Sequence, residues 1–431
     1  MSTPPKGIPI PQGREEVNDV TDQRIELVVT GMAAGGEGVS RLGDGRVVFV
    51  RGALPGERVA AVLTDARRRF ARAETVDVVD PSPARLAPPC PLVAAGCGGC
   101  GWQHIDPAAQ RRLKADIVLE ALRRSARLDP PEPDPGALLP ATGWRTTVRA
   151  TIGDDERAGF RRHHAHSPVP VGDHGCLVAH PLVDEILTQG RFPHPVTEVT
   201  VRAGVATGER LVVADPRAGD AEVPAGVVLV GLDALAAGHR AWIHEEVAGR
   251  RWRVSAESFF QVRPDGAEAL IDAVAAALGE ALAPGTALVD LYGGVGLFAG
   301  ALGQRTGGRV LVVEANRSAT ADARVNLADL TDARVVAADV RRWRPSAADV
   351  VVADPSRHGL GADVVSRIGA TGAGALALVS CDPAALGRDA GLLAAGGWAL
   401  ESLTLVDLFP HTPHIEVVTG WNRRPSLRPV S

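Results

Sequence analysis

The stretch A-L-V-D-L-Y-G-G-V-G-L-F-A, residues 287–299, decides the fold of this chain. It begins with a short apolar run that ends on Asp290, and it passes through glycines into a second apolar segment. Glycines allow the backbone to approach a ligand closely, and the N–H groups at the start of a helix can donate to that ligand. The stretch therefore predicts a buried strand, a ligand-binding loop and a helix, in that order.

The sequence around this stretch alternates strand and helix patterns from about residue 256 onward. Such alternation is typical of a parallel sheet with helical crossovers. The predicted strands are 287–290, 309–314, 334–339, 349–354 and 375–380. The acids that end the first four are Asp290, Glu314, Asp339 and Asp354. Since parallel strands end at the same edge, we expect these acids to lie along one edge of one sheet.

The glycine loop fits two kinds of adenosine-containing cofactor. The spacing G-x-G-x-x-A from Gly294, with Glu314 about twenty residues further on, matches the dinucleotide fingerprint of nicotinamide enzymes. An acid directly before the glycines, here Asp290, is typical instead of methyltransferase loops, and Asp339 could hold an adenine. The loop alone leaves NAD and S-adenosylmethionine open, and these two features favour S-adenosylmethionine.

A second chemical signal follows the fifth predicted strand. The motif S-C-D-P places Cys381 where that strand ends, and Glu416 lies downstream in F-P-H-T-P-H-I-E. A thiol at this edge, with a carboxylate to accept a proton, suits covalent chemistry on an electron-poor ring. A lone cysteine is more often a small buried hydrophobe, but the acids and glycines nearby favour the catalytic interpretation.

The other cysteines form a pattern in the first half of the chain: Cys90, Cys97, Cys100 and Cys176. An odd total of 5 cysteines, with no signal peptide at the start, argues against a disulfide framework. Four thiolates can bind zinc or an iron–sulfur cluster. Structural zinc usually uses two C-x-x-C knuckles, and this sequence has only C-G-G-C, which favours iron–sulfur.

The rest of the chain divides by pattern. Residues 1–22 are polar and proline-rich and predict a disordered tail. Residues 23–82 carry about five short β patterns separated by turns, which predicts a small barrel. Residues 83–255 are mixed, with a predicted helix over 108–127 and several β-like pieces.

The charge pattern bears on the partner. A net charge of −5 counts mildly against a nucleic-acid partner, although its distribution matters more. Of the 46 basic residues only Lys6 and Lys114 are lysines. Arginines cluster at 67–72, at 111–112 and at 161–162, and they suit phosphate contacts and base stacking. Since no apolar run has the length of a signal peptide or a membrane span, we expect a cytoplasmic protein.

Taken together, these motifs resemble the RNA uracil-5-methyltransferase family, in particular its iron–sulfur branch that carries a TRAM domain and acts on 23S ribosomal RNA. The segments that carry the resemblance follow in order: G-M-A-A-G-G-E-G-V-S-R-L, C-x6-C-G-G-C-x-x-Q-H, Cys176, S-F-F-Q-V, D-L-Y-G-G-V-G, Glu314, D-P-S-R-H-G, S-C-D-P and F-P-H-T-P-H-I-E. The resemblance implies a class I, Rossmann-like α/β methyltransferase domain over 256–431. It also implies a TRAM or OB-like barrel over 23–82 and a central α+β iron–sulfur domain over 83–255.

The resemblance also implies roles for single residues. Cys381 is the nucleophile that adds to the uracil ring, and Glu416 is the base that removes the proton from carbon 5. The pocket for S-adenosylmethionine and the substrate is formed by Gln261, Tyr292, Gly294, Glu314, Asp339 and Asp354. A 4Fe–4S cluster is held by Cys90, Cys97, Cys100 and Cys176. We expect the enzyme to act on RNA as a monomer.

Some positions depart from the family pattern and leave the substrate open: Leu297, Ser356, Asp382 and Arg263. One alternative is the same reaction on transfer RNA. Another is 5-methylcytosine formation, although a cytosine enzyme would more often have proline before the cysteine, where Ser380 stands here. Two alternatives come from other classes, namely an NAD-dependent oxidoreductase and a non-catalytic iron–sulfur protein that binds RNA.

Overall fold

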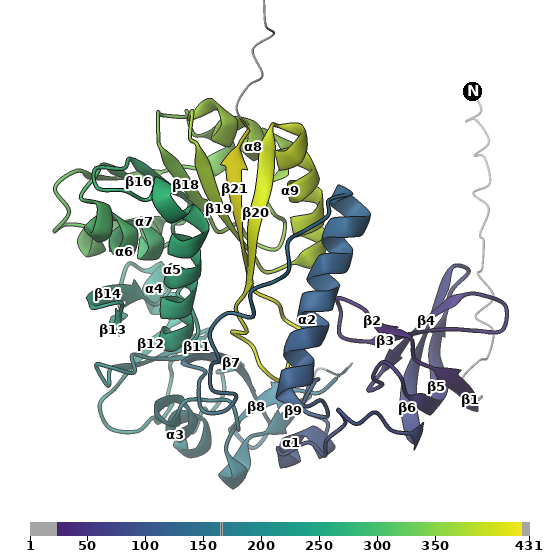
Figure 1. The fold of residues 1–431 in the computed structure, drawn as a ribbon. Helices are drawn as coiled ribbons and strands as arrows, with labels where there is room; N and C mark the ends of the chain where they lie inside the picture. Colours follow the sequence, from purple (N-terminus) through teal and green to yellow (C-terminus); the bar gives the residue numbers. More distant parts are fainter. Residues whose placement is uncertain (1–23, 164, 166, 425–431) are drawn as a thin grey trace, which may run out of the picture. The chain divides into compact units, whose positions relative to one another are not determined.

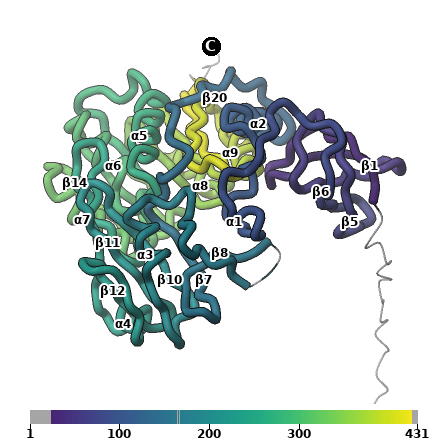
Figure 2. The backbone as a smooth tube through the Cα atoms, turned by 90° about the horizontal axis from the view of Figure 1, so that it is seen from below, coloured from purple at the N-terminus to yellow at the C-terminus, as the bar shows by residue number. Residues whose placement is uncertain are grey.

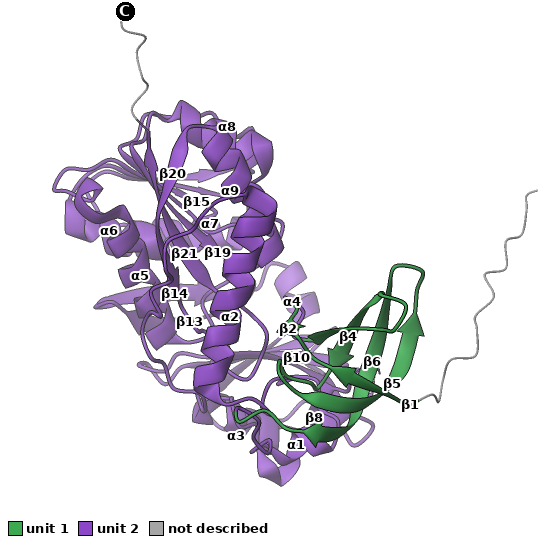
Figure 3. Ribbon diagram, turned by 45° about the vertical axis from the view of Figure 1, so that its right-hand side comes forward, with its two compact units in different colours: residues 1–33, 37–83 green, residues 34–36, 84–431 purple. Residues whose placement is uncertain are grey.

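The computed structural model describes residues 24–163, 165 and 167–424. The contacts divide the chain into two compact units, drawn in green and purple in Figure 3. The first unit takes the residues up to 33 together with 37–83, and the second takes 34–36 together with 84–431. The predicted tail over 1–22 lies outside the described residues, and so does His164.

The first unit is a six-stranded sheet in the order β1-β5-β6-β4-β3-β2. Its strands are β1 (Arg24–Val28), β2 (Gly31–Met32), β3 (Gly38–Arg41), β4 (Val47–Arg51), β5 (Arg58–Ala66) and β6 (Phe70–Asp80). Alternate residues of β5, Val59, Ala61 and Leu63, are buried in its core. Because β1 at one end of the order also contacts β3, the sheet curls on itself as expected for a small barrel.

The first part of the second unit is built on a sheet in the order β12-β11-β10-β7-β8-β9. Its strands are β7 (Thr147–Ile152), β8 (Ala158–Arg161), β9 (Pro168–Pro170), β10 (Glu198–Ala203), β11 (Arg210–Asp215) and β12 (Val227–Gly231). The helices around it are α1 (Pro91–Ala94), α2 (Pro107–Ala121), α3 (Pro181–Gln189) and α4 (Leu232–Ala236). The helix predicted over 108–127 is confirmed, with its last turn, Leu122–Ala126, in π-helical form.

A two-stranded hairpin leads to the second part of this unit. It consists of β13 (Trp242–Val247) and β14 (Arg250–Ser255), and α5 (Pro264–Leu278) follows. Residues 84–255 thus combine helices with sheets, as an α+β arrangement requires. They belong to the same compact unit as 256–431.

The last part of the chain is a seven-stranded sheet in the order β17-β16-β15-β18-β19-β21-β20. Its strands are β15 (Leu288–Leu291), β16 (Val310–Glu314), β17 (Ala333–Ala337), β18 (Val350–Ala353), β19 (Ala375–Ser380), β20 (Trp398–Leu405) and β21 (Val417–Arg423). Neighbours among β15 to β19 pair in parallel, whereas β21 is antiparallel to both β19 and β20. The five predicted strands are confirmed. The antiparallel pair β20 and β21 was not among the predictions.

Helices pack against this sheet (Figure 1) and are α6 (Leu297–Thr306), α7 (Arg317–Asn326), α8 (Gly361–Ala370) and α9 (Pro383–Ala395). Helix α5 packs on β19 and β21, while α9 packs on β19 and β20. Helix α2 lies against α9, which joins the first part of this unit to the last, as the backbone trace also shows (Figure 2). Within the described part of the chain, none of the helices has the length and apolarity needed to cross a membrane.

Candidate active site

Cys381 directly follows β19, and Glu416 directly precedes β21. Strands β19 and β21 are antiparallel, and Ser380 lies opposite Val417. The next residues outward from this pair are Cys381 and Glu416, so the register brings the thiol and the carboxylate together at the strand ends. Glu416 is 6% exposed, and Cys381 is partly exposed. The thiol can therefore meet a substrate while the carboxylate stays away from bulk water.

Asp354 completes this group of side chains. It follows β18, which pairs in parallel with β19. Burial raises the pKa of both Asp354 and Glu416, and the charge of Asp354 raises the pKa of Glu416 further. Two buried acids that repel each other hold protons more tightly than exposed acids do. Once ionised, Glu416 is therefore a stronger proton acceptor than an ordinary glutamate.

The surroundings of Cys381 favour the protonated thiol over the thiolate. Burial, helped by the charges of Glu416 and Asp354, raises the pKa of Cys381 to about 11. Arg357 opposes this shift through its positive charge. Arg357 belongs to the motif D-P-S-R-H-G, which by itself does not indicate a role for this arginine. The structure assigns it the charge that favours the thiolate.

A cavity of about 30 Å³ lies beside the glycine loop. Among the predicted cofactor residues it is lined by Gln261, Tyr292, Gly294 and Asp354. Leu297, which departs from the family pattern, also lines it. Glu314 adjoins the loop because its carboxylate accepts hydrogen bonds from the N–H groups of Gly294 (3.0 Å) and Asn316 (2.6 Å). The structure thus gathers most of the predicted pocket around one loop.

Asp339 occupies a different position from these residues. It starts the short 3-10 turn Val340–Arg342 and forms an ion pair with Arg341 at 2.6 Å. Arg341 lowers the pKa of Asp339 to about 2. Partial burial raises the pKa of the Tyr292 phenol to about 12, and the charge of Asp339 contributes, so the two side chains are near each other. Among the described residues, those that line the cavity do not include Asp339.

Asp290 precedes the glycines of the loop and is not among the residues predicted to form the pocket. It is fully buried, and one carboxylate oxygen accepts from the Ala299 N–H at 3.0 Å. The other oxygen, Oδ1, has no hydrogen-bond partner in the described structure. Burial, with the charges of Asp354 and Glu314, raises the pKa of Asp290 to about 8. A buried acceptor without a partner beside a glycine loop suits a cationic ligand group.

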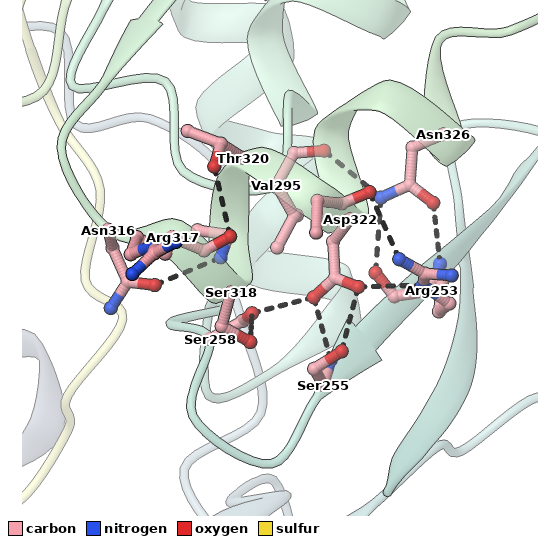
Figure 4. Close-up of polar contacts among 12 residues, drawn as sticks. Arg253, Ser255, Ser258, Val295, Asn316, Arg317, Ser318, Thr320, Asp322 and Asn326 are labelled. Atoms are coloured by element: carbon pink, nitrogen blue, oxygen red, sulfur yellow. Dashed lines mark hydrogen bonds and ion pairs between the residues drawn. The ribbon is translucent and has the colours of Figure 1, made fainter. Parts of the chain in front are cut away.

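A buried carboxylate fixes the segment before Gln261 (Figure 4). Asp322 of α7 accepts hydrogen bonds from Arg253 Nε (2.7 Å), from the N–H and hydroxyl of Ser255 (2.8 Å each) and from the hydroxyl of Ser258 (2.6 Å). Arg202 donates to the carbonyls of Ser255 and Ser258. The next residue, Phe259, is 65% exposed and lines the cavity beside the glycine loop. The network therefore presents an exposed aromatic ring at the rim.

The four other cysteines line a separate cavity of about 110 Å³. Burial raises the pKa of Cys97 and Cys176 and raises that of Cys100 to about 12. Within the ranges that the structure describes, no group of three or more His, Cys, Asp or Glu side chains is arranged to hold a metal ion. The structure thus gathers the predicted ligands around one space without forming a coordination site.

Arginines gather next to this cavity. Arg149, Arg161, Arg162 and His163 line an open space of about 630 Å³. Arg149 and Arg161 both form ion pairs with Glu198. In the first unit, Arg72 forms an ion pair with Glu37 and lies over the ring of Phe49 at 5.6 Å. Exposed arginines in these positions keep donors available at the surface.

Comparison with known proteins places these features in context. A TRAM domain model matches residues 22–76. An uncharacterised RNA methyltransferase of Streptomyces coelicolor is 39% identical over 428 residues, which cover 92% of each chain. A 23S rRNA (uracil(1939)-C(5))-methyltransferase, RlmD, of Alkalilimnicola ehrlichii is 32% identical over 93% of this chain and 96% of its own.

A solved structure is similar over nearly the whole length. It is the tRNA (uracil-54, C5)-methyltransferase of Pyrococcus abyssi in complex with S-adenosyl-L-homocysteine, with a TM-score of 0.69 at 21% identity. The alignment covers 92% of this chain and 99% of the other. At this identity the likeness concerns the fold alone, and it agrees with the methyltransferase fold that the resemblance implied.

Proposed function

Because the chain belongs to the RNA methyltransferases, as relatives 39% and 32% identical over most of its length show, we propose that it methylates carbon 5 of one uridine in 23S ribosomal RNA. The observation that carries this proposal is the position of Cys381 across from Glu416 at the ends of β19 and β21. The glycine loop lies at the same sheet edge, since β15 and β19 both flank β18. The thiol, the carboxylate and the glycine loop therefore lie along the same edge of the sheet.

The chemistry needs each of these groups. Carbon 5 of uracil is a poor nucleophile until the thiolate of Cys381 adds to carbon 6 and leaves an enolate. S-adenosylmethionine supplies the methyl group that carbon 5 then takes. Glu416 removes the proton from carbon 5, and the carbon–sulfur bond breaks to return the thiolate and 5-methyluridine. Cysteine suits both the first and the last step because its sulfur adds and leaves readily.

The cofactor would be held by the residues around the glycine loop. Tyr292 and Gln261 line the cavity, and Glu314 is placed beside Gly294 to accept from a ribose. The unpartnered Oδ1 of Asp290 supports a positively charged ligand, and S-adenosylmethionine carries an ammonium and a sulfonium. These observations support S-adenosylmethionine as the methyl donor for this reaction.

Several features support RNA as the substrate. A TRAM domain model matches residues 22–76. The arginines around the open space at Arg161 supply groups that can bind phosphates. Phe259, exposed at the rim of the cofactor cavity, offers a face on which an extruded base can stack. Single-stranded loops are favoured targets because their bases cost less to extrude.

Mapping 5-methyluridine across ribosomal and transfer RNA, in cells with and without this gene, tests the proposal. We expect one uridine of 23S ribosomal RNA to lose its methyl group in the deletion strain. The loss of a methyl group from transfer RNA alone would reassign the substrate and leave the reaction unchanged. If no uridine changes, the proposal is wrong.

We also infer that the four cysteines around the smaller cavity bind a 4Fe–4S cluster. The support is that Cys90, Cys97, Cys100 and Cys176 line one space of about 110 Å³, and that burial raises the pKa of Cys97, Cys100 and Cys176. Cationic iron would displace the thiol protons. Protein purified without oxygen should be brown and contain about four irons per chain. Stoichiometric zinc without iron would contradict the inference.

A further inference from the structure

Lys114 is an unusual residue in this chain. It is one of two lysines among 46 basic residues, and its side chain is fully buried. It lies on α2, and its Nζ donates to the carboxylate of Asp407 (2.7 Å) and to the carbonyl of Phe409 (3.0 Å). The Lys114 Nζ also lies 5.9 Å from the ring centre of Trp102. A lysine is almost never fully buried unless its charge is paired, as it is here.

The partners of Lys114 belong to the loop that carries the proposed base. Residues 406–416, called here the base loop, connect β20 to β21 and end on Glu416. The N–H of Val406 donates to the carbonyl of Glu416 at 2.9 Å, which closes the two ends of the loop. Between these ends the loop contains no regular strand or helix. Contacts from other segments must therefore fix its conformation.

Those contacts come from the segment 102–114. His411 donates its backbone N–H to Gln110 Oε1 (2.7 Å), and its carbonyl accepts from the N–H of Trp102 (2.9 Å). Gln110 and Lys114 are four residues apart, so both project from one face of α2. Helix α2 thereby holds the beginning and the middle of the base loop, while the β19–β21 register holds its end.

A lysine suits this position better than an arginine does. Its compact ammonium directs separate donors at a carboxylate and at a backbone carbonyl, whereas a guanidinium is larger and planar. The site is closed around it, since Asp407 is 9% exposed and His411 is 5% exposed. The chain uses arginine at nearly every other basic position, so the geometry of this site accounts for the exception.

We propose that Lys114 is a positioning residue, which holds the base loop so that Glu416 meets the proton on carbon 5. The inference rests on the proposed function. It assigns Lys114 to the proton-removal step alone, because Cys381 and the cofactor cavity are held by β19 and the glycine loop. Loss of Lys114 would then slow the release of methylated RNA and leave thiolate addition and cofactor binding nearly unchanged.

The test uses the full-length protein, S-adenosylmethionine and an RNA fragment that contains the target uridine. In single-turnover reactions, Lys114→Met should release product about 10- to 100-fold more slowly, since small misplacements of catalytic groups cost this much. A methylated covalent RNA–protein adduct should accumulate on denaturing gels. The affinity for S-adenosylmethionine should stay within about twofold of the native value, because α2 contributes no residue to the lining of the cofactor cavity.

Two controls separate positioning from loss of stability. Val118→Ala removes buried volume one turn further along α2 without touching the ion pair, and it should not build up adduct. Lys114→Met with Asp407→Asn removes the unpaired charge and should recover thermal stability while release stays slow, because the Phe409 carbonyl still lacks its donor.

Distinct outcomes overturn this inference and the proposed function. If Lys114→Met releases product at the native rate, or if its release recovers together with stability in the double variant, Lys114 has no positioning role. If Val118→Ala accumulates adduct as Lys114→Met does, the effect is structural. If the native enzyme forms no adduct with RNA that contains 5-fluorouridine at the target, the covalent mechanism itself fails.

Discussion

At the scale of single residues, the surroundings of Cys381 disfavour the thiolate that the proposed reaction needs. The structure surrounds Cys381 with Glu416 and Asp354, and these acids make its thiolate less stable. The same burial that disfavours the thiolate strengthens Glu416 as a base. In the absence of RNA these surroundings therefore disfavour the Cys381 thiolate, and substrate binding has to compensate.

Replacing the two central residues should separate the steps. Cys381→Ala should abolish methylation and keep S-adenosylmethionine binding nearly native, because other residues line the cofactor cavity. Glu416→Gln should instead accumulate a methylated RNA–protein adduct, since addition and methyl transfer precede its step. A denaturing gel would show an RNase-sensitive, slow-migrating band for Glu416→Gln and none for Cys381→Ala. A band with the alanine variant would make Cys381 a structural residue.

Arg357 gives a pH prediction with a definite sign. Its charge lowers the pKa of Cys381, so Arg357→Gln should raise that pKa further above its ordinary value. Adduct formation at pH 7.5 should become about 3- to 10-fold slower, because less thiolate is present. The deficit should shrink as pH rises towards the pKa of the thiol, which is about 11 in the native protein. A deficit that is independent of pH would mean that Arg357 acts on RNA binding instead.

At the scale of elements, helix α7 holds two segments that surround the cavity beside the glycine loop. Its Asp322 holds the end of β14 and Ser258, and its Asn326 donates to the carbonyl of Val295 in the glycine loop at 3.0 Å. One helix thus fixes both walls of the cavity, although it contributes no lining residue itself. The alternating pattern predicted a helix at this place in the sequence, but not that it links S-F-F-Q to the glycine loop.

Asp322→Asn should therefore weaken the cofactor site. Arg253 and Arg202 would lose their buried counter-charge, and such losses cost about 3–5 kcal/mol of unfolding free energy. The dissociation constant for S-adenosylmethionine should rise, measured by calorimetry alongside thermal unfolding. Asp272→Asn is the matched control, since Asp272 is 73% exposed and pairs at the surface with Arg305, which is 47% exposed. Its effect should stay below about 1 kcal/mol.

At the scale of the whole molecule, the chain combines a TRAM domain with a unit that contains two chemical sites. That unit holds the cysteine cavity and the candidate active site, and its helix α2 packs against α9. Trp102, two residues after Cys100, donates to His411 in the base loop. The arginines that line the open space beside the cysteine cavity add a surface suited to phosphates.

RNA binding should depend on that surface. Replacing Arg161 and Arg162 by glutamine should weaken binding of the RNA substrate. It should also flatten the dependence of the binding constant on salt by about 0.7 log unit for each lost contact on a single strand. Arg334→Gln is the control, because Arg334 is 77% exposed on another part of the unit. An unchanged salt slope in the double variant would exclude this surface from the interface.

The sequence by itself determined the architecture and most of the cofactor loop. Apolar runs that end on acids predicted β15 to β19, because burial on both faces of a parallel sheet leaves a continuous apolar signal. It missed β20 and β21, whose pairing contains a bulge between Leu400 and Ser402. The glycine loop left NAD and S-adenosylmethionine open, and the relatives are named RNA methyltransferases, which supports a methyl donor over NAD. Asp339 forms an ion pair with Arg341 and is not among the residues that line the cavity, so its role toward the cofactor stays a prediction.

Only the tertiary structure decided which distant residues act together. The register of β19 and β21 places Cys381 against Glu416, and α2 brings Lys114 to Asp407, 293 positions away in the chain. Local patterns report which face of a strand or helix is buried, since that depends on neighbouring residues. They carry no information on which buried charge will meet which, because such pairs form only when packing removes both groups from water.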